Sequence, residues 1–476
     1  MNASKSTKFV EITKSMLLVV LFLFTILLLY FFWGDTPLKN LIRDNPQQHE
    51  SLNPAALLKP DYISVCLGGG SHTLAPIEFN TIMDCFRLFS EGGNLSVEAI
   101  TKEAYDKAVA YPSLRAAFTY YVPFSVICEI YGIDRISGSD AIDALSELAY
   151  VSDSDELLYV ADKIAGKHFK VIGSRCACFE TLKTEISNAE VGNAMYFTLS
   201  TYIGGGSNNA LCPVSFASAI SGASYSLEDF SKPNEKAGGI VKSFFSDNFD
   251  FVRQIREENG AVIYMYGHGR TVVTANVDGT LEYKREEDGR ASGQGRYFDA
   301  LEKACAFVSA HSAFQSIDGI EFTPCIKGAV VNPGGKRGYR FIFGIETNGY
   351  KIYYQAGAPV TVDVVDGRVS YLKRDLVNVR LGDLDGAAAS REVFPAFDLL
   401  WVNLDYMAGV ITELQQEGLM DMSFESLVEM VTRFDCGYLK SSSDKTILEA
   451  VWVVTLDGLE FFFGLDDGNP LGWRVN

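Results

Sequence analysis

The residues of this chain that could carry out chemistry do not form a recognised catalytic motif. The sequence holds no G-x-S-x-G nucleophile elbow, no H-E-x-x-H metal site and no G-x-x-x-x-G-K-[ST] phosphate loop. The glycine runs Gly68–Gly70 and Gly204–Gly206 lack the lysine and hydroxyl residue of a phosphate loop, so we expect turns there. The motif search favours binding or regulation over catalysis, and we predict that the chain is not an enzyme and uses no cofactor.

Two matches to S-x-x-K have the spacing of a serine–lysine pair. Ser370 and Lys373 lie in a predicted strand, where they would face opposite sides of the sheet. Ser442 and Lys445 lie in a polar turn, and no S-D-N or K-T-G motif accompanies either match. We therefore expect structural roles for both pairs.

Cysteine and histidine supply the other candidate groups. Cys176-Ala-Cys178 could offer two thiolates to a metal, but zinc sites usually need a wider spacing and two further ligands. Two core residues of a strand would look the same, so no metal site is predicted. His268 lies between two glycines, which favours a solvated turn tip over a general base. No local triad signature surrounds the other histidines, although a triad is assembled in space: His49, His72, His168 and His311.

Composition limits the partners and the redox chemistry. The formal net charge is −19 and the pI is about 4.8, which argues against nucleic acid or an anionic membrane surface as a partner. The nine cysteines are scattered and odd in number, and several lie in apolar runs. We expect free thiols and hypothesise an envelope that preserves them, such as that of an anaerobe. A thiol count that finds most cysteines paired would contradict this.

The strongest single feature is the apolar segment Met16–Trp33. Its 18 residues include no charge, proline or glycine, and a helix of this length spans about 27 Å, close to the hydrocarbon thickness of a bilayer. Three lysines precede the segment and Asp35 follows it, so we expect a cytoplasmic N-terminus and an extracytoplasmic C-terminal part in the cell membrane. A cleaved signal peptide is disfavoured by the length of the apolar run and by the lack of a cleavage site.

Large side chains on this segment are the candidate contacts with a membrane partner. The segment has no small-xxx-small motif, so packing would depend on bulky residues. Aromatic rings at its outer end favour the membrane interface. The predicted partner-binding residues are Phe22, Phe24, Thr25, Tyr30 and Trp33.

The rest of the chain is predicted to be α+β, with antiparallel β-meanders packed on helices in two or three extracytoplasmic domains. The domain prediction is a cytoplasmic tail (1–15), a transmembrane helix (16–33), a stalk (34–60), an N-terminal α+β domain (61–190), a middle domain with a β-meander (191–295) and a C-terminal α+β domain (296–476).

Periodicity and turn signals predict the elements within these domains. Strands are expected at 62–67, in the meanders 261–286 and 319–374, and near the C-terminus at 447–458 and 459–468. Residues 114–133 read as a strand, a proline-bent crossover and a short helix, and 156–173 are open between helix and strand. Helices are expected at 78–91, 96–110 with Ser96 as N-cap, 137–153, 244–258, 296–312, 399–416 and 423–434 with Ser423 as N-cap.

The two meanders share a sub-pattern. Asp278-Gly279 and Asp366-Gly367 are each followed by an apolar residue, a tyrosine and basic residues, and 456–463 is a weaker echo. Either an α+β module is duplicated or these are unrelated hairpins with Asp-Gly turns, which are common.

The order of these segments resembles the YycH family of two-component-system regulators of Gram-positive bacteria. The resemblance rests on the N-terminal membrane segment followed by 57–69 (LLKPDYISVCLGG), 114–133, 244–283 and the helix near 301–311. The last third, with GYRFIFGIE through VSYLKR (338–374) and the hairpin at 450–463, is similar to the partner family YycI. The chain departs from the pattern at 194–224 and in its many cysteines.

The resemblance implies a function and partners. Members of this family sit outside the membrane on one helix, associate with a second single-pass regulator (YycI-like), and with it contact a sensor histidine kinase that controls cell-wall metabolism. No catalytic residue carries over, because the family has none. The alternatives are an envelope ligand-binding or assembly module and, disfavoured by the missing motifs, a wall- or peptide-directed hydrolase.

Overall fold

The computed structural model describes residues 52–475, apart from gaps at 76, 94, 134–135, 153–157, 175, 190–194, 207, 215–222, 228–234, 287–294, 312–313, 315–321, 348, 381–392, 416–421 and 441–446. The predicted transmembrane segment, with Phe22, Phe24, Thr25, Tyr30 and Trp33, lies outside the described residues and stays a prediction. Within the described part, no helix has both the length and the apolar character that crossing a membrane requires. Leu52–Asn476 forms one compact unit.

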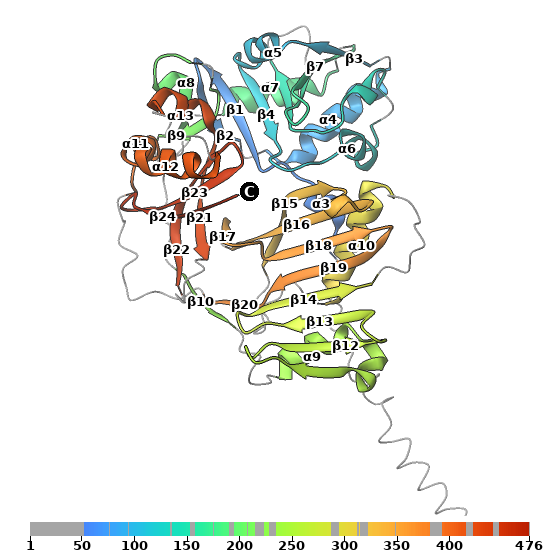
Figure 1. The fold of residues 1–476 in the computed structure, drawn as a ribbon. Helices are drawn as coiled ribbons and strands as arrows, with labels where there is room; N and C mark the ends of the chain where they lie inside the picture. The colour runs from blue at the N-terminus through green and yellow to red at the C-terminus, as the bar shows by residue number, and fades with distance from the viewer. Residues whose placement is uncertain are drawn as a thin grey trace, which may run out of the picture. The chain divides into compact units, whose positions relative to one another are not determined.

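The first sheet has nine strands, and all of its neighbouring strands are antiparallel (Figure 1). In pairing order they are β3 (Ser96–Ile100), β7 (Lys167–Ile172), β6 (Leu158–Asp162), β5 (Glu147–Val151), β4 (Ser113–Ala117), β1 (Tyr62–Gly68), β2 (Ser71–Leu74), β8 (Met195–Thr198) and β9 (Leu211–Pro213). Strands β8 and β9 fall within the predicted middle domain (191–295) but pair with the first sheet.

Helices cover both faces of this sheet. Helices α4 (Phe79–Glu91) and α7 (Phe179–Asn188) contribute to the main core, in which the Tyr150 ring stacks on Phe179 at 5.2 Å between centroids. Helix α5 (Lys102–Val109) covers the other face, where Tyr105 packs with Ala149 and Val151 of β5. Because successive side chains of a strand alternate, Glu147 shares the α5 face with Ala149 and Val151.

The second sheet has fifteen strands. Its main path is β11 (Arg253–Arg256), β12 (Val262–Tyr266), β13 (Thr271–Ala275), β14 (Thr280–Arg285), β19 (Arg368–Asp375), β18 (Val360–Val365), β16 (Gly338–Thr347), β17 (Tyr350–Tyr354), β21 (Val431–Lys440), β22 (Ile447–Leu456), β10 (Ala223–Leu227) and β20 (Val377–Arg380). Beside this path, β15 (Thr323–Val331) pairs with β16, β23 (Leu459–Gly464) pairs with β22, and β24 (Pro470–Val475) pairs with β23.

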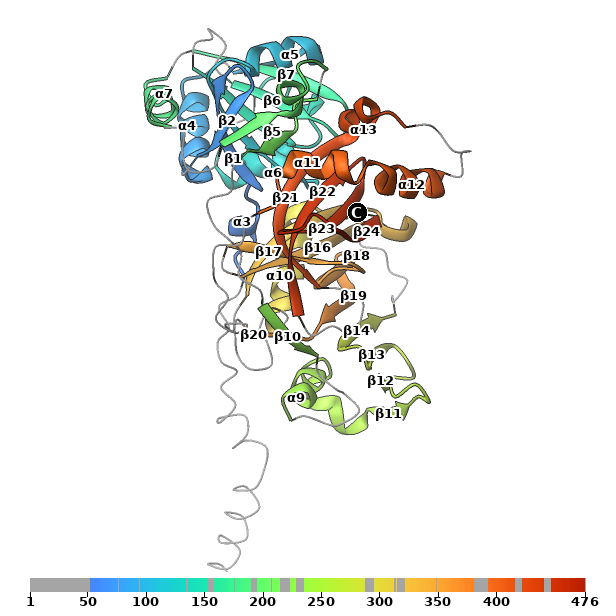
Figure 2. The same ribbon diagram turned by 90° about the vertical axis from the view of Figure 1, so that its left-hand side faces the viewer.

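Helices also pack on the second sheet. Helix α10 (Tyr297–Ala310) lies across β16, β18 and β19. Helices near the C-terminus lie beside the last strands of the chain (Figure 2). Tyr406, on one of them, contacts the rings of Phe461 and Phe463 edge-on. These helices are α11 (Ala396–Val402), α12 (Leu404–Gln415) and α13 (Phe424–Met430), and the remaining helical elements are α3 (Pro54–Leu57), α6 (Phe124–Ile130), α8 (Leu199–Tyr202), α9 (Glu235–Ser243), η1 (Ser139–Ala141), η2 (Ser246–Phe251) and η3 (Pro333–Gly335).

The last residues of the predicted stalk (34–60) belong to the folded body. Helix α3 begins after the N-cap Asn53, whose side chain accepts a hydrogen bond from the Ala55 N–H. Leu57 and Leu58 are buried against the core. The prediction of a stalk up to residue 60 is therefore wrong at this end, because two consecutive leucines supply enough apolar surface to dock the segment.

Two predicted helices are wrong, and a third begins later than predicted. Ser96 begins strand β3, and helix α5 starts after the N-cap Thr101 and ends close to the predicted residue 110. Residues 137–153 form the short turn η1 and strand β5, and 244–258 include η2 and strand β11. Strand β5 is buried on both faces, and a short apolar run of that kind looks the same in sequence as a buried helix.

The strongest local signals are confirmed. Both predicted meanders form. The Asp366-Gly367 turn carries the expected left-handed backbone at both residues, with φ of 48° and 72°, whereas in the Asp278-Gly279 turn only Gly279 does, with φ of 81°. Helix α10 buries Leu301, Ala304, Cys305 and Val308, which are spaced at i, i+3, i+4 and i+7 and form one apolar face. Ser423 caps α13 by accepting a hydrogen bond from the Ser426 N–H, but the chain after Met430 is strand rather than helix.

The parallel pairing of β17 with β21 joins the C-terminal strands to the rest of the second sheet and requires a glycine. A Cβ at Gly437 would lie 2.3 Å from the Lys351 carbonyl oxygen and 2.9 Å from a ring carbon of Tyr353. We expect Gly437→Ala to cost about 1–3 kcal/mol, the usual range for overpacking, seen as a lower urea midpoint. Gly205→Ala, with no atom within 4 Å, is the control; equal midpoints for the two variants would contradict the prediction.

Candidate functional site

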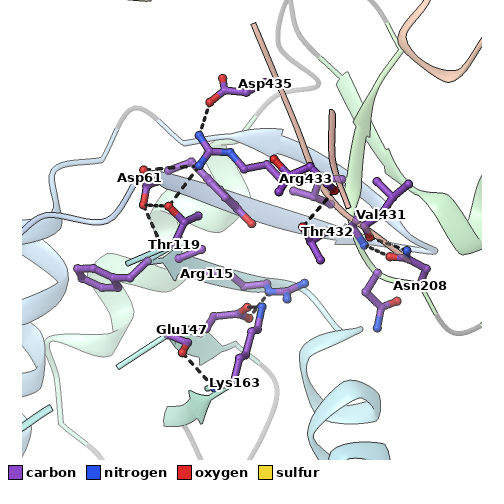
Figure 3. Close-up of a pocket in the computed structure, with 18 of the residues that line it drawn as sticks. Asp61, Arg115, Thr119, Glu147, Lys163, Asn208, Val431, Thr432, Arg433 and Asp435 are labelled. Carbon is purple, nitrogen blue, oxygen red and sulfur yellow. Dashed lines mark hydrogen bonds and ion pairs between the residues drawn. The ribbon is translucent and has the colours of Figure 1, made fainter. Parts of the chain in front are cut away.

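A cavity of about 720 Å³ lies between the two sheets (Figure 3). One wall comes from β4, β5 and the loops beside them, and the other comes from β15, β17, β21 and β23. This volume lies within the range of small-molecule sites, about 300–1,000 Å³. The lining is unusual for its number of charged side chains, so the site is best described through their pairing.

The first wall is organised by the buried carboxylate of Glu147. Its side chain is 1% exposed and accepts hydrogen bonds from Arg115 Nε at 2.6 Å and Tyr105 Oη at 2.9 Å. Lys163 Nζ lies 2.9 Å from the second oxygen (Figure 3). Burial alone would raise the pKa of Glu147, but Arg115 and Lys163 outweigh it and hold that pKa well below its usual value.

Asp61, just before β1, connects this wall to the second sheet. Its carboxylate accepts hydrogen bonds from the Thr119 N–H at 2.9 Å and the Thr119 hydroxyl at 2.7 Å. Lys351 Nζ donates to it at 2.7 Å, and Arg433 Nη1 lies 3.7 Å away. Burial opposes ionisation, yet Lys351 and Arg433 lower the pKa of Asp61 well below its usual value.

Asp435 extends the network along β21. Its carboxylate contacts the Arg433 guanidinium and accepts a hydrogen bond from the Tyr353 hydroxyl, as well as one from the Cys436 N–H at 2.9 Å. Arg433 and Asp435 are two residues apart on one strand and therefore share a face. Despite burial, Arg433 and Lys351 lower the pKa of Asp435.

Asn208 fixes the far side of the cavity. Its Nδ2 donates to the Val428 carbonyl at 2.6 Å and the Val431 carbonyl at 2.7 Å, while its Oδ1 accepts from the Ala210 N–H at 2.7 Å. The loop after α8 is thereby attached to the start of β21 (Figure 3). These bonds hold the loop that contains Asn208 against the start of β21, although no strand of the first sheet pairs with β21 there.

Three buried carboxylates of the cavity are held as fixed charges. Glu147, Asp61 and Asp435 each have a lowered pKa, so all three stay ionised near neutral pH. A general acid or base works best when its pKa lies near the operating pH. These three carboxylates therefore position cations rather than transfer protons.

Lys327 on β15 differs from these paired cations. Within the described part of the chain, its Nζ is shielded from solvent and has no hydrogen-bond partner. It lies 3.9 Å from the centre of the Tyr353 ring. Burial lowers the pKa of Lys327 to about 7.

The described histidines lie in different surroundings. His268 is an exposed turn residue with φ of 58°, as predicted. His311 Nδ1 lies 2.7 Å from Ser243 Oγ, and the same hydroxyl lies 2.7 Å from the Ile240 carbonyl. The Ser243 hydroxyl is thus within hydrogen-bond distance of both the imidazole and a main-chain carbonyl of α9. Burial lowers the pKa of His311 to about 4, and its ring stacks on Phe244.

All nine cysteines are unpaired, as the sequence analysis expects. The Cys176 and Cys178 sulfurs lie 3.0 Å apart in a turn before α7, rather than in a strand. No group of three or more potential ligands gathers around them or elsewhere in the described residues. Burial raises the pKa of Cys178, so its thiol is a poor nucleophile at neutral pH.

None of the cavity's charged residues was identified from the sequence. A usable signal existed at single charges inside apolar strands, namely Arg115 in LRAAF and Glu147 in SELAYV. Such charges are rarely buried unless paired. Arg433 and Asp435 were missed because the segment before them was predicted to continue a helix.

Comparisons with known proteins give similarities in fold. No family model matches the chain, and no curated protein matches it. Among solved structures, YycH from Bacillus subtilis matches with a TM-score of 0.49 and 13% identity over 86% of this chain and 96% of that one. An uncharacterised protein from Eubacterium rectale matches with 0.34 and 11% over 60% and 89%, and the Bacillus megaterium YpeB C-terminal domain with 0.28 and 12% over 51% and 97%. The similarity to YycH is distant, and none of the three assigns a role to a residue of this chain.

Proposed function

We propose that this chain is a membrane-anchored, extracytoplasmic regulator of a two-component sensor histidine kinase. The carrying observation is the uninterrupted apolar segment Met16–Trp33, which joins a short lysine-containing tail to a large acidic body. The order of segments similar to the YycH family supports the same role. The fixed, paired charges of the cavity also fit a protein that binds rather than one that turns over a substrate.

In this proposal the partners meet the chain inside the bilayer. The sensor kinase and a second single-pass, YycI-like regulator contact the transmembrane segment through Phe22, Phe24, Thr25, Tyr30 and Trp33. Large side chains can drive such packing by van der Waals contact, since a bilayer offers no hydrophobic gain for helix association. The N-terminus lies in the cytoplasm and the α+β body outside.

Exchange of residues 16–33 for an unrelated transmembrane helix tests the proposal. We expect the kinase's output genes to change and the kinase to be lost from co-purification out of membranes, because the contact surface is removed while the body stays anchored. Phe22→Leu with Phe24→Leu should have a smaller effect in the same direction. Leu27→Ile with Leu28→Ile is the matched control, because it preserves apolar volume. Unchanged output together with unchanged co-purification would contradict the proposal.

A ligand-binding role is the second candidate, and one observation favours it. The cavity between the two sheets has the volume of a small-molecule site, and several polar groups converge on it. The two roles are compatible, because a regulator can take its input from a ligand bound outside the membrane.

A further inference from the structure

We propose that the cavity between the two sheets binds a small molecule that carries a carboxylate or phosphate group, and that the Lys327 ammonium receives this anionic group. The inference stands apart from kinase regulation, because it concerns only the cavity and would hold for a binding module without a kinase. Four features of the site support it: a bulge, two glycines, an aromatic ring and an unpaired nitrogen.

A β-bulge places Lys327. The antiparallel register of β15 and β16 shifts between Ile326 and Gly328, which makes Lys327 the extra residue without an opposite partner. A bulge changes the direction of one side chain relative to its strand, and bulges are frequent beside functional sites. The irregularity here directs a lysine toward the cavity, which it lines.

Two glycines leave room for this arrangement. A Cβ at Gly344, on β16, would lie 3.0 Å from Lys327 Cγ and 2.9 Å from the Cys325 sulfur. A Cβ at Gly437, on β21, would lie 2.9 Å from the ring of Tyr353, over which Lys327 Nζ sits. The Lys327 side chain and the Tyr353 ring thus each occupy space that a residue larger than glycine at position 344 or 437 would fill.

The charge of Lys327 is not neutralised by its surroundings. Glu460 on β23 is the acid that most favours the charged form, but it already accepts a hydrogen bond from Arg474 Nε on β24 at 2.6 Å. Lys351 on β17 opposes the charge of Lys327 and is itself bound to Asp61. The remaining neighbours are the Cys325 thiol on β15, whose pKa burial raises to about 11, and the Tyr353 phenol, whose pKa is raised well above its usual value.

A shielded amine in this setting is a receptor for an anion. An unpaired charge away from water is costly, and an incoming carboxylate or phosphate would supply both the counter-ion and the missing hydrogen-bond acceptors. Three other cations that line the cavity, Arg115, Lys163 and Arg433, each already have a carboxylate partner. The rest of the cavity, which includes Tyr105 and Asn209, would hold the remainder of the ligand.

Binding should be coupled to protonation of Lys327. The anion prefers the ammonium form, and the free protein holds that form mainly below pH 7, since the pKa of Lys327 is about 7. Affinity should therefore fall about tenfold for each pH unit above 7, until the ligand itself can no longer recruit the proton.

Isothermal titration calorimetry on the full chain in detergent micelles tests the site with two probes. Sulfate stands for the phosphate class and acetate for the carboxylate class, and both keep their charge between pH 6.5 and 8.5. At constant ionic strength we expect at least one probe to bind at pH 6.5 and to bind at least tenfold more weakly at pH 8.5. The tighter of the two probes identifies the ligand class.

Three variants separate the site from a general charge effect. Lys327→Met should abolish binding, and Lys327→Arg should restore it without the pH dependence, because guanidinium stays charged. Gly344→Ala should weaken binding although all charges remain. Lys167→Met, an exposed lysine outside the cavity, should change nothing. Equal binding by wild type and Lys327→Met, a pH-independent affinity, or no binding of either probe would overturn the proposal. None of these outcomes bears on the transmembrane exchange above.

Discussion

Replacement of Glu147 by glutamine should lower the free energy of unfolding by about 3–5 kcal/mol, the usual cost of removing one partner from a buried ion pair. The carboxylate is 1% exposed, and the Arg115 side chain that it neutralises is 14% exposed. The variant would leave Arg115 charged and shielded without a counter-ion. Lys163 should contribute little, because its side chain is 54% exposed and can turn to water.

Urea unfolding of the wild type and variants measures this effect. Glu98→Gln is the control, because Glu98 is 58% exposed and pairs with Lys170 on a neighbouring strand, so its loss should cost no more than about 1 kcal/mol. Glu147→Leu with Arg115→Met should recover part of the loss, since it removes both charges. A Glu147→Gln midpoint as high as that of Glu98→Gln would contradict the prediction.

The contribution of Glu147 should also depend on pH. Its pKa is lower in the folded protein than in the unfolded chain, where a glutamate titrates near about 4.3. The stabilisation is therefore present above about pH 4.3 and is lost as the pH falls below it, when the unfolded state takes up the proton first. The difference between wild type and Glu147→Gln should shrink between pH 5 and pH 3.

Lys327→Met should change the pH dependence of stability in the neutral to alkaline range. The pKa of Lys327 is about 7 in the folded protein, against about 10.4 for a lysine in the unfolded chain. Between these values the unfolded state binds the extra proton, so wild-type stability should rise by up to about 1.4 kcal/mol per pH unit relative to the variant. At pH 6.5 the variant should be the more stable protein, since methionine fills similar space without a charge, and loss of the contact with Tyr353 offsets this only partly.

Chemical unfolding of both proteins at pH 6.5, 8 and 9 gives the comparison. The stability of Lys167→Met should change with pH in parallel with that of the wild type, because Lys167 is exposed and its charge is hydrated in both the folded and the unfolded state. Parallel profiles for wild type and Lys327→Met would mean that Lys327 keeps an ordinary pKa. A more stable Lys327→Met protein would also exclude unfolding as the reason for lost anion binding.

Local sequence signals correctly predicted the elements that have a regular spacing of apolar residues or a characteristic turn sequence. Leu301, Ala304, Cys305 and Val308 mark the buried stripe of α10, and the Asp366-Gly367 pair marks a hairpin turn. The prediction for strand β5 failed because both faces of the strand are buried, so its sequence shows no alternation of apolar and polar residues. The prediction of Ser96 as an N-cap failed because a serine followed by an acid is typical of a helix start. In the structure, pairing with β7 makes this segment a strand instead.

The candidate site was beyond local reasoning for a different reason. Its central contact joins Asp61 to Lys351, residues that are 290 positions apart. Nothing near Asp61 in the sequence distinguishes it from an ordinary surface acid. The bulge at Lys327 depends on its pairing with β16, and its unpaired nitrogen depends on Glu460 already being engaged by Arg474. Such properties arise from tertiary packing.

The ion pair between Asp61 and Lys351 on β17 limits the order in which the chain can fold during synthesis. Ribosomes add roughly 5–20 residues per second, so the partner of Asp61, 290 positions later, follows it after roughly 15–60 s. In that interval strands β1 to β9 of the first sheet can pair, while the Asp61 carboxylate has no ion pair because Lys351 has not yet been synthesised. Nascent chains halted before Lys351 should therefore hold an ordered first sheet in which residues 52–61 are protease-sensitive, and this sensitivity should disappear once the second sheet has formed.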